Sequence, residues 1–290
     1  MAIPDPAPIG LIGLGLLGSA LSKRLLDKGF QVLGYDLREP ARAQLDAAGG
    51  IAVDSPAALA EQVSVLVLAV FDTGDVLSIL EGPGSVLRES AVKLVIDCST
   101  GDAAAIGALA ARLSAHAVDF LEAPLSGSSS QIAAGDATML IGGEARVIAA
   151  HVALLNALSP TRIHVGGAGM GASAKLATNL VLGLNRAALA EGMAFAERLG
   201  IAPAPFLELV LASPARSDAA TLKGPLMVAG DFAPQSRIRQ HLKDLDLMLA
   251  QSPALPLTQA HAGVLRAAIA AGDGDLDNAA IIQQMRRTIG

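Results

Sequence analysis

The chain has 290 residues, enough for about two domains at roughly 150 residues each. Hydrophobic residues make up 52% of it and charged residues 17%, which supplies a core and excludes a disordered protein. The formal net charge of −6 disfavours a protein that wraps nucleic acid or lies on an anionic membrane. Cys98 is the single cysteine, which excludes an internal disulfide and a cysteine-based zinc cluster.

The N-terminal region predicts neither a signal peptide nor a membrane span. Residues 1–8 contain three prolines and no basic segment. The apolar run from Ile9 to Leu21 is interrupted by four glycines and is shorter than the roughly 20 residues that a span requires. We therefore expect a cytoplasmic protein with no membrane partner and no nucleic-acid partner.

The first half of the chain alternates short apolar runs with helical stretches. Helices are expected over 19–28 and 38–49, the first of them ending at Gly29. Strands are expected over 9–13, 31–35, 63–70, 93–97, 117–121 and 138–142. Because apolar strands separated by helices are typical of parallel sheets covered on both faces, this pattern predicts an α/β domain with a doubly wound sheet of the Rossmann type.

The pattern changes near Gly171, after which no convincing strand is found. A helical pattern without proline covers 172–199, and Pro, Gly and Asp separate the helices that follow it. Those helices are expected over 204–211, 218–227, 236–250, 258–271 and 278–285. The sequence therefore predicts a dinucleotide-binding domain over 1–167 and an all-helical domain over 168–290, joined by the long helix.

A glycine-rich turn lies between the first strand and the first helix. Its sequence is Gly13-Leu14-Gly15-Leu16-Leu17-Gly18, the G-x-G-x-x-G pattern. Glycines allow a sharp turn and a close approach of a pyrophosphate, which then lies at the positive end of the helix. Asp36 ends the second strand, eighteen residues after the last glycine, where a ribose-binding acid is expected. The alternative is a glycine turn without a ligand.

Asp36 also bears on which nicotinamide cofactor is bound. A carboxylate accepts hydrogen bonds from a free ribose hydroxyl and repels a 2′-phosphate, so it favours NAD. Arg38 lies two residues further on and is able to hold that phosphate, which leaves NADP open. The other interpretation of Arg38 is a solvated residue at a helix start.

Further candidates follow the next two strands. Val70 and Phe71 end one strand, and Ser99 and Thr100 follow the other. Ligands of open sheets lie at the carboxyl ends of the strands, so these residues are candidates for contact with cofactor or substrate. Ser99 and Thr100 are equally suited to capping the next helix.

Two later stretches carry polar groups suited to catalysis. One is the loop Glu122-Ala123-Pro124-Leu125-Ser126-Gly127-Ser128, whose small residues and hydroxyls offer donors to a carboxylate. The other contains Lys175 and Asn179, which are four residues apart and share one face of the long helix. Burial disfavours the charged form of an amine, which suits a proton shuttle. The alternative is that Lys175 is a solvated helix residue.

These motifs, in this order, resemble those of the β-hydroxyacid dehydrogenase family, which includes 3-hydroxyisobutyrate dehydrogenase and tartronate semialdehyde reductase. The resemblance covers nearly the whole chain. The cofactor motif matches at the glycine turn, and the substrate motif D-A-P-V-S-G-G matches at 122–128. The catalytic motif G-x-G-x-x-x-K-x-x-N-N matches at 169–179, and a later K-D-L element matches at Lys243-Asp244-Leu245.

The resemblance implies oxidation of a small β-hydroxy acid, or reduction of the matching semialdehyde, with hydride transfer to or from a nicotinamide. Lys175 would be the general acid/base. Ser126, Gly127, Ser128 and Asn179 would bind the carboxylate substrate. Lys243 would lie near the cofactor. No metal is implied, and relatives are homodimers or homotetramers built through the helical domain.

The chain departs from the family motifs at Glu122, Ser128, Thr178 and Phe71, where Asp, Gly, Asn and Pro are common. These changes leave Lys175 in place but put the substrate in doubt. An imine reductase of the same fold is an alternative, although such relatives usually replace the lysine. A non-catalytic dinucleotide-binding protein is another. The five histidines show no metal-ligand spacing and are interpreted as ordinary surface or core residues.

Overall fold

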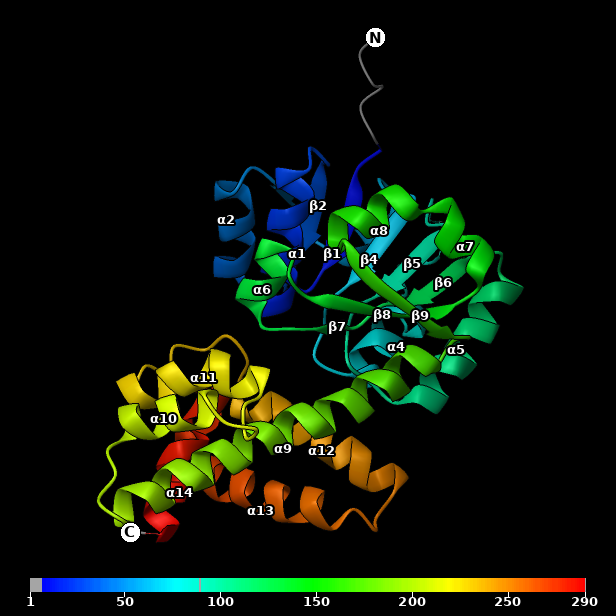
Figure 1. Cartoon of the computed structure of the whole chain (residues 1–290). Coiled ribbons are helices and arrows are strands. Elements are labelled where there is room, and N and C mark those ends of the chain that lie inside the picture. Colours follow the sequence, from blue (N-terminus) through cyan, green and yellow to red (C-terminus); the bar gives the residue numbers. More distant parts are fainter. Residues whose placement is uncertain (1–6, 89, 290) are drawn as a thin grey trace. The chain divides into compact units, whose positions relative to one another are not determined.

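The computed structural model describes residues 7–88 and 90–289, whose course is shown in Figure 1. Residues 1–6, which belong to the stretch predicted to carry no signal peptide, lie outside the described residues. The chain forms two compact units, of which the first ends at Lys175 and the second begins at Leu176. Both of these residues belong to one long helix, α9 (Met170–Arg198).

The first unit is built on a mostly parallel sheet, which confirms the predicted fold class. Its strands follow the order β3-β2-β1-β4-β5-β6-β8-β7, and β9 pairs with β8. Antiparallel pairing is found where β8 meets β6 and β7. The strands are β1 (Ile9–Ile12), β2 (Val32–Tyr35), β3 (Ile51–Ala52), β4 (Val65–Leu68), β5 (Leu94–Asp97), β6 (Asp119–Glu122), β7 (Leu125–Ser126), β8 (Thr138–Gly143) and β9 (Thr161–Gly166).

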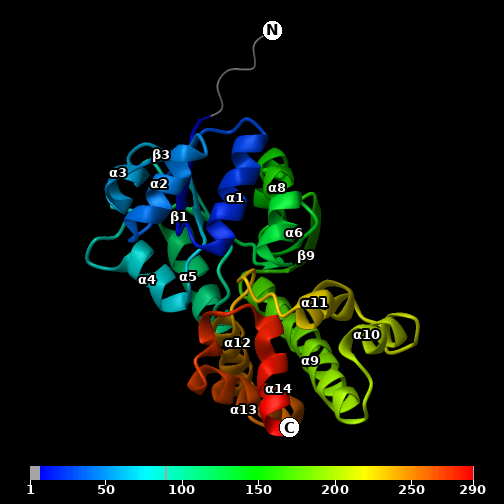
Figure 2. The ribbon, with the colours of Figure 1, turned by 90° about the vertical axis from the view of Figure 1, so that its left-hand side faces the viewer.

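Helices cover both faces of this sheet. Figure 2 shows α4 and α5 on one side of the sheet, with α1, α6 and α8 on the other. Side chains alternate between the two faces, so Val67 packs in one core cluster while its neighbours Leu66 and Leu68 pack in the other. The helices of this unit are α1 (Leu16–Asp27), α2 (Glu39–Ala47), α3 (Pro56–Ala60), α4 (Thr73–Glu81), α5 (Ala103–Ala115), α6 (Ser129–Ala134), α7 (Ala145–Ala150) and α8 (Val152–Leu158).

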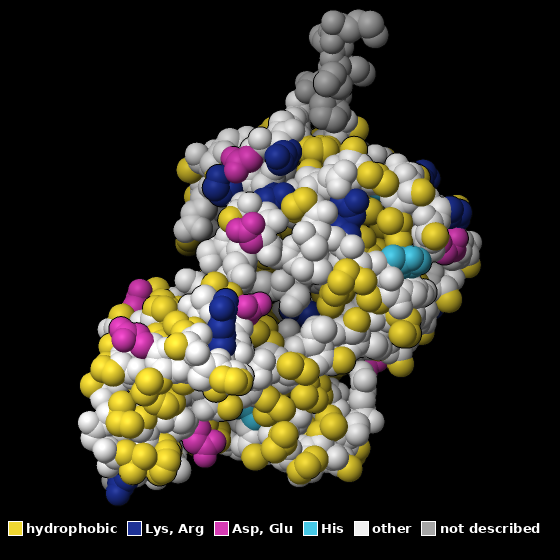
Figure 3. All heavy atoms as spheres, in the orientation of Figure 1, with side chains coloured by type: hydrophobic (Ala, Val, Ile, Leu, Met, Phe, Trp, Pro, Cys, Tyr) yellow, Lys and Arg dark blue, Asp and Glu magenta, His cyan; other side chains and the backbone are white. Residues whose placement is uncertain are grey.

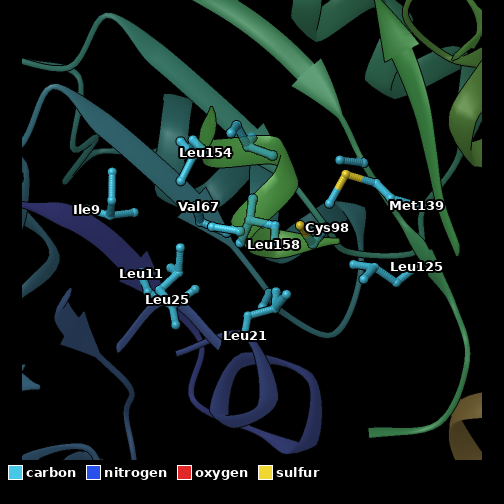
Figure 4. Packing of buried hydrophobic residues seen from close by; sticks show 14 of the residues in the cluster. Ile9, Leu11, Leu21, Leu25, Val67, Cys98, Leu125, Met139, Leu154 and Leu158 are labelled. Atoms are coloured by element: carbon cyan, nitrogen blue, oxygen red, sulfur yellow. The ribbon is translucent and has the colours of Figure 1, made fainter. Parts of the chain in front are cut away.

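The core on the α1 face is continuous from one side of the sheet to the other. In Figure 4, Leu21 and Leu25 of α1 lie beside Leu11 of β1, and Leu158 lies beside Cys98. Cys98 is 1% exposed, and burial raises the pKa of its thiol. The single cysteine is therefore a packing residue and not a nucleophile.

The second unit is helical in its described residues, as predicted, apart from one isolated bridge between Arg237 and Asp277. Its core contains α9, α12 and α13 among others, and is filled by residues such as Met193, Leu245 and Leu265. The helices that follow α9 are α10 (Pro203–Leu211), α11 (Asp218–Ala229), α12 (Ile238–Gln251), α13 (Pro256–Ala270) and α14 (Ile281–Ile289), with short 3₁₀ turns η1 (Asp273–Asp275) and η2 (Asn278–Ala280).

Several predicted boundaries were wrong, and each has a local cause. The strand expected from 117 begins at Asp119, because Ala117 turns the chain with φ +56°. The helix expected over 278–285 begins as the 3₁₀ turn η2, capped by the Asp277 side chain, and continues as α14. Strand β9 was missed because its alternating side chains are mostly exposed or half-buried.

No helix among the described residues is both long and apolar enough to cross a membrane. On the face in Figure 3, charged side chains are widely spaced and hydrophobic side chains lie between them. This surface agrees with the 17% content of charged residues.

Candidate active site

The glycine turn is shaped by close backbone contacts. Gly13 has φ +93°, and a Cβ added there would lie 2.3 Å from the carbonyl oxygen of Ala69. A Cβ on Gly18 would lie 1.8 Å from the carbonyl oxygen of Gly13. Both positions therefore require glycine. The close contacts that glycine allows pack the ends of β1 and β4 against the start of α1.

The N-terminus of α1 is suited to an anion. A Cβ added at Gly15 would meet only the Arg38 Nη2 atom, at 3.9 Å, so the backbone there is open to close approach. Gly15 is the N-cap, no side chain caps α1 within the described residues, and the first turn has no acidic residue. Leu16 and Leu17 begin this helix, half-buried. Their N–H groups and the helix dipole fit a pyrophosphate.

Asp36 connects the glycine turn to the end of β2. Its carboxylate accepts a hydrogen bond from the Leu14 N–H at 2.8 Å and two from the Arg38 guanidinium, at 2.9 Å from Nε and 3.0 Å from Nη2. Burial tends to raise the pKa of Asp36, but the hydrogen bonds from Arg38 and Leu14 outweigh it, so this pKa lies below its usual value. Arg42 donates to the Asp36 carbonyl oxygen at 2.6 Å. Two arginines therefore lie beside the predicted ribose site.

The loops after β4 and β5 are tied together. The Val70 N–H donates to Ser99 Oγ at 3.1 Å, and the Ser99 N–H donates to Asp97 Oδ1 at 2.9 Å. Phe71 is 45% exposed, and Thr100 is half-buried. The interpretation of Ser99 and Thr100 as helix caps is wrong.

The cap of α5 is Asp102, whose carboxylate accepts from the Ala105 N–H at 2.7 Å. An acid three residues before a free N–H serves this purpose as well as a hydroxyl does. Ser99 and Thr100 are thereby left at the carboxyl end of β5, where open sheets bind ligands.

Lys175 lies in the second turn of α9 and is 8% exposed, so the interpretation as a solvated lysine is wrong. Its Nζ donates to the carbonyl oxygen of Leu125 at 2.5 Å. An ammonium offers three hydrogens, and this contact fixes the direction of the side chain while engaging one of them.

Glu122 holds the beginning of the same helix. Its Oε1 accepts from the Gly171 N–H at 2.6 Å and its Oε2 from the Ala172 N–H at 3.2 Å. Burial raises the pKa of Glu122, against which the backbone hydrogen bonds act. The segment from Glu122 to Leu125 thus contacts α9 twice, at its first N–H groups and at the Lys175 ammonium.

The serine loop has a structural use for some of its hydroxyls. Ser128 is the N-cap of α6, and its Oγ accepts from the Gln131 N–H at 3.3 Å and lies 2.9 Å from Ser130 Oγ. Gly127 has φ +156°, and a Cβ there would lie 2.8 Å from Ala137 Cβ. Ser126 pairs with Thr138 in the sheet and is half-buried. The tight turn at Gly127 therefore places the two predicted substrate serines on either side of it.

In the second unit, Asn179 and Lys243 meet at Asp244. Asn179 is 7% exposed, and its Nδ2 donates to Asp244 Oδ2 at 2.9 Å. The Lys243 Nζ lies 3.6 Å from Asp244 Oδ1. Asp244 was not among the predicted site residues, although the K-D-L match contains it. Its place next to Lys243 in the K-D-L match was the signal that could have identified it.

The described residues contain no group of three His, Cys, Asp or Glu side chains arranged to hold a metal ion.

A glycine turn that leads into an uncapped helix, with an acid at the end of the next strand, defines a dinucleotide-binding protein. Two family models match this chain: the NAD binding domain of 6-phosphogluconate dehydrogenase over residues 8–167, and the NAD-binding domain of NADP-dependent 3-hydroxyisobutyrate dehydrogenase over residues 169–285. The chain belongs to the β-hydroxyacid dehydrogenase family and is an NAD(P)-dependent dehydrogenase that acts on CH–OH groups.

Similar proteins match over almost their full length. A probable 3-hydroxyisobutyrate dehydrogenase-like protein of Arabidopsis thaliana is 32% identical, over 99% of this chain and 96% of its own. L-threonate dehydrogenase of Cupriavidus necator is 31% identical, over 95% of each chain. The solved 3-hydroxyisobutyrate dehydrogenase of Salmonella typhimurium is 29% identical over 95% of this chain and 98% of its own, with a TM-score of 0.85.

Proposed function

We propose that this enzyme interconverts a small β-hydroxy acid and its semialdehyde or keto acid, with Lys175 as the general acid/base. The observation that carries the proposal is the buried Lys175 ammonium, aimed by its hydrogen bond to the Leu125 carbonyl oxygen. Lys175 occupies the lysine position of the family's catalytic motif. A buried amine whose direction is fixed is suited to exchange a proton with one substrate oxygen.

The residues of the first unit fit the cofactor. NAD(P) supplies the hydride chemistry when bound, at C4 of its nicotinamide. The turn at Gly13, Gly15 and Gly18 would hold the pyrophosphate against the N-terminus of α1. Val70, Phe71 and Thr100 follow β4 and β5 at the ligand-binding edge of the sheet and would contact the cofactor there. Lys243 is a further proposed cofactor residue because it belongs to the K-D-L element of the family.

Lys175 would move one proton in each direction. During oxidation, the neutral amine accepts the proton of the substrate hydroxyl as the hydride leaves the carbon. During reduction, the ammonium returns that proton to the carbonyl oxygen. Glu122 touches no reacting atom in this scheme. It stabilises the first turn of α9 and thereby fixes the position of the Lys175 backbone in the next turn.

Substrate binding would use donors for a carboxylate. Ser126 and the Gly127 N–H lie at the tight turn, and Asn179 supplies an amide that Asp244 orients. The Ser128 hydroxyl already caps α6. Its contribution to substrate binding would therefore come from the position of Ser128 at the N-terminus of that helix. The departures from the family motif at Glu122 and Ser128 would make this pocket differ from those of relatives.

NAD is the favoured cofactor because Asp36 directly follows β2, where a ribose-binding acid is expected, and already pairs with Arg38. A 2′-phosphate would have to displace Arg38 from Asp36, which is possible because the Arg38 side chain is 59% exposed. NADP therefore binds more weakly than NAD in this proposal.

We also expect a cytoplasmic homodimer or homotetramer. Large apolar side chains on the surface of the helical unit support association, among them Val181, Phe195, Leu209 and Leu257. Sedimentation of the purified enzyme measures the oligomeric state and checks this part of the expectation.

The experiment that tests the proposed activity is a panel of hydroxy acids and aldehyde acids with NAD(H) and NADP(H), followed at the absorbance of the reduced nicotinamide. Turnover of at least one small β-hydroxy acid or its semialdehyde is expected. Binding of NAD(H) without turnover across the panel would favour a non-catalytic dinucleotide-binding protein. Reduction of cyclic imines in its place would favour the imine reductase alternative.

A further inference from the structure

A charged side chain lies in the interior of the helical unit, at a position that the proposed reaction does not use. Arg186 belongs to α9 and is 3% exposed. Neither its Nε nor its Nη2 has a hydrogen-bond partner among residues 7–88 and 90–289. Burial lowers the pKa of Arg186 to about 10, so the guanidinium stays charged at neutral pH. Buried polar groups without partners are rare and call for an explanation such as a bound ion.

Three other arginines of this protein bind a carboxylate through the same Nε–Nη2 edge. Arg38 donates through these two atoms to Asp36, and Arg286 donates through them to Glu197 at 2.9 and 2.7 Å. Arg112 does the same with Glu81, at 2.6 and 2.8 Å. The geometry of this edge matches an anionic acceptor, because its two N–H groups are parallel.

Asp277 is the carboxylate whose charge acts on Arg186, but its acceptor positions are occupied. It is fully buried, and both of its oxygens accept from Lys223 Nζ, at 2.8 and 3.0 Å. Three backbone N–H groups, of Gln235, Ser236 and Ala279, also donate to it. A carboxylate has about four lone-pair sites, so none is left for Arg186. Two buried cations therefore share one buried anion.

His261 provides a further donor close to Arg186. It is 3% exposed, and neither ring nitrogen has a partner within the described residues. A Cβ on Gly183, three residues before Arg186, would lie 3.1 Å from His261 Cε1, so the imidazole packs against α9 there. Burial and the charge of Arg186 lower the pKa of His261 to about 4, which leaves a neutral ring with one N–H to donate.

We propose that the Nε–Nη2 edge of Arg186 binds one monovalent anion, either chloride or a short carboxylate, with His261 as a second donor. An ordered water is the competing occupant. A water leaves the excess positive charge uncompensated, whereas an anion compensates it, and charge is what burial penalises most.

The test measures the melting temperature of the whole enzyme in chloride or in formate, at constant ionic strength set by a bulky sulfonate buffer. At about ten times the dissociation constant, the bound anion should raise the melting temperature by about 2 °C, and the rise should continue with the logarithm of the anion concentration. The rise should vanish in Arg186→Met and persist in Arg216→Met, which removes an exposed arginine of the same unit. Comparison of the two salts identifies whether a halide or a carboxylate is bound.

A melting temperature that does not depend on the anion in the unmodified enzyme overturns the proposal, as does an equal rise in Arg186→Met. If Arg186→Met does not fold, crystals of the unmodified enzyme grown with bromide or with formate decide the question. Anomalous bromide density or formate density at the Arg186 edge supports the site. Density for water alone, with both salts, overturns it.

Discussion

The carboxylate of Glu122 accepts a hydrogen bond of 2.6 Å from the backbone N–H of Gly171, and so ties the end of β6 to the first turn of α9. Three residues later, the Leu125 carbonyl oxygen accepts from the ammonium of Lys175. One short segment therefore fixes both the start of this helix and the direction of its candidate catalytic side chain. A carboxylate at a helix N-terminus is favourable because it satisfies free N–H groups and compensates the helix dipole.

The charge of Glu122 should matter to turnover without any contact with substrate. We expect Glu122→Gln to lower kcat about tenfold, since a weaker cap costs roughly 1–2 kcal/mol of positioning energy. The dissociation constant for NAD should change less than twofold. Steady-state kinetics and cofactor titration check this, with the exposed Glu61→Gln as the matched control. Unchanged kcat in Glu122→Gln would show that the cap does not position Lys175.

Gly142 should be needed to make room for Glu122. A Cβ at Gly142 would lie 2.0 Å from Glu122 Oε1, so Gly142→Ala should destabilise the fold by about 2 kcal/mol. Gly84→Ala, where a Cβ meets no atom within 4 Å, is the control. Denaturant unfolding measures both. The shorter side chain of Glu122→Asp should recover part of the loss in the double variant, and strict additivity of the two changes would contradict this explanation.

Asp36 should discriminate between the cofactors. We expect Asp36→Ala to weaken NAD more than NADP, because the change removes an acceptor for the ribose hydroxyl and releases Arg38, which pairs with it at 2.9 Å. Titration of both dinucleotides, followed by fluorescence, measures the two dissociation constants. The exposed Asp27→Ala serves as the control. An equal loss of affinity for both cofactors would refute the role of Asp36 in specificity.

His261 should make stability depend on pH. Its pKa is lowered to about 4 by burial and by the charge of Arg186, so the unfolded chain binds its proton more readily than the folded chain does. The free energy of unfolding should therefore be greatest above about pH 6.5 and fall by up to about 3 kcal/mol as the pH decreases to 4.

Denaturant unfolding at several pH values in a buffer without chloride measures this dependence. His261→Gln should flatten it between pH 6.5 and 4, and His116→Gln, at an exposed position, should leave it as it is. An unchanged pH dependence of the free energy of unfolding in His261→Gln would assign the effect to other groups.

The sequence was sufficient to predict the elements whose hydrophobic pattern is strong. Strand β4 is an unbroken apolar run, and α9 was predicted within two residues of its observed ends, Met170 and Arg198. Strand β9 was missed because it lies at the edge of the sheet and its side chains are half-buried or exposed. Its pattern does not differ from that of a loop.

The environment of the candidate site depended on contacts between distant residues, which the sequence does not display. Lys175 shares a helix face with Asn179 in any helical reading, but its burial follows from packing on a segment fifty residues earlier. In the sequence, Glu122 was only a departure from the substrate motif, where Asp is common. Its contact with the N-terminus of α9 joins residues 49 positions apart. Asp244 was overlooked beside Lys243, because pairing with Asn179 spans 65 residues.

The most direct test of the account is the turnover of Lys175→Ala on a substrate identified by the panel, with Lys28→Ala as a control at an exposed lysine. We predict that kcat/KM falls by about a thousandfold, as expected for loss of a general acid/base, while the dissociation constant for the cofactor changes less than twofold. Turnover of Lys175→Ala within a few fold of the unmodified enzyme would contradict the assignment of Lys175.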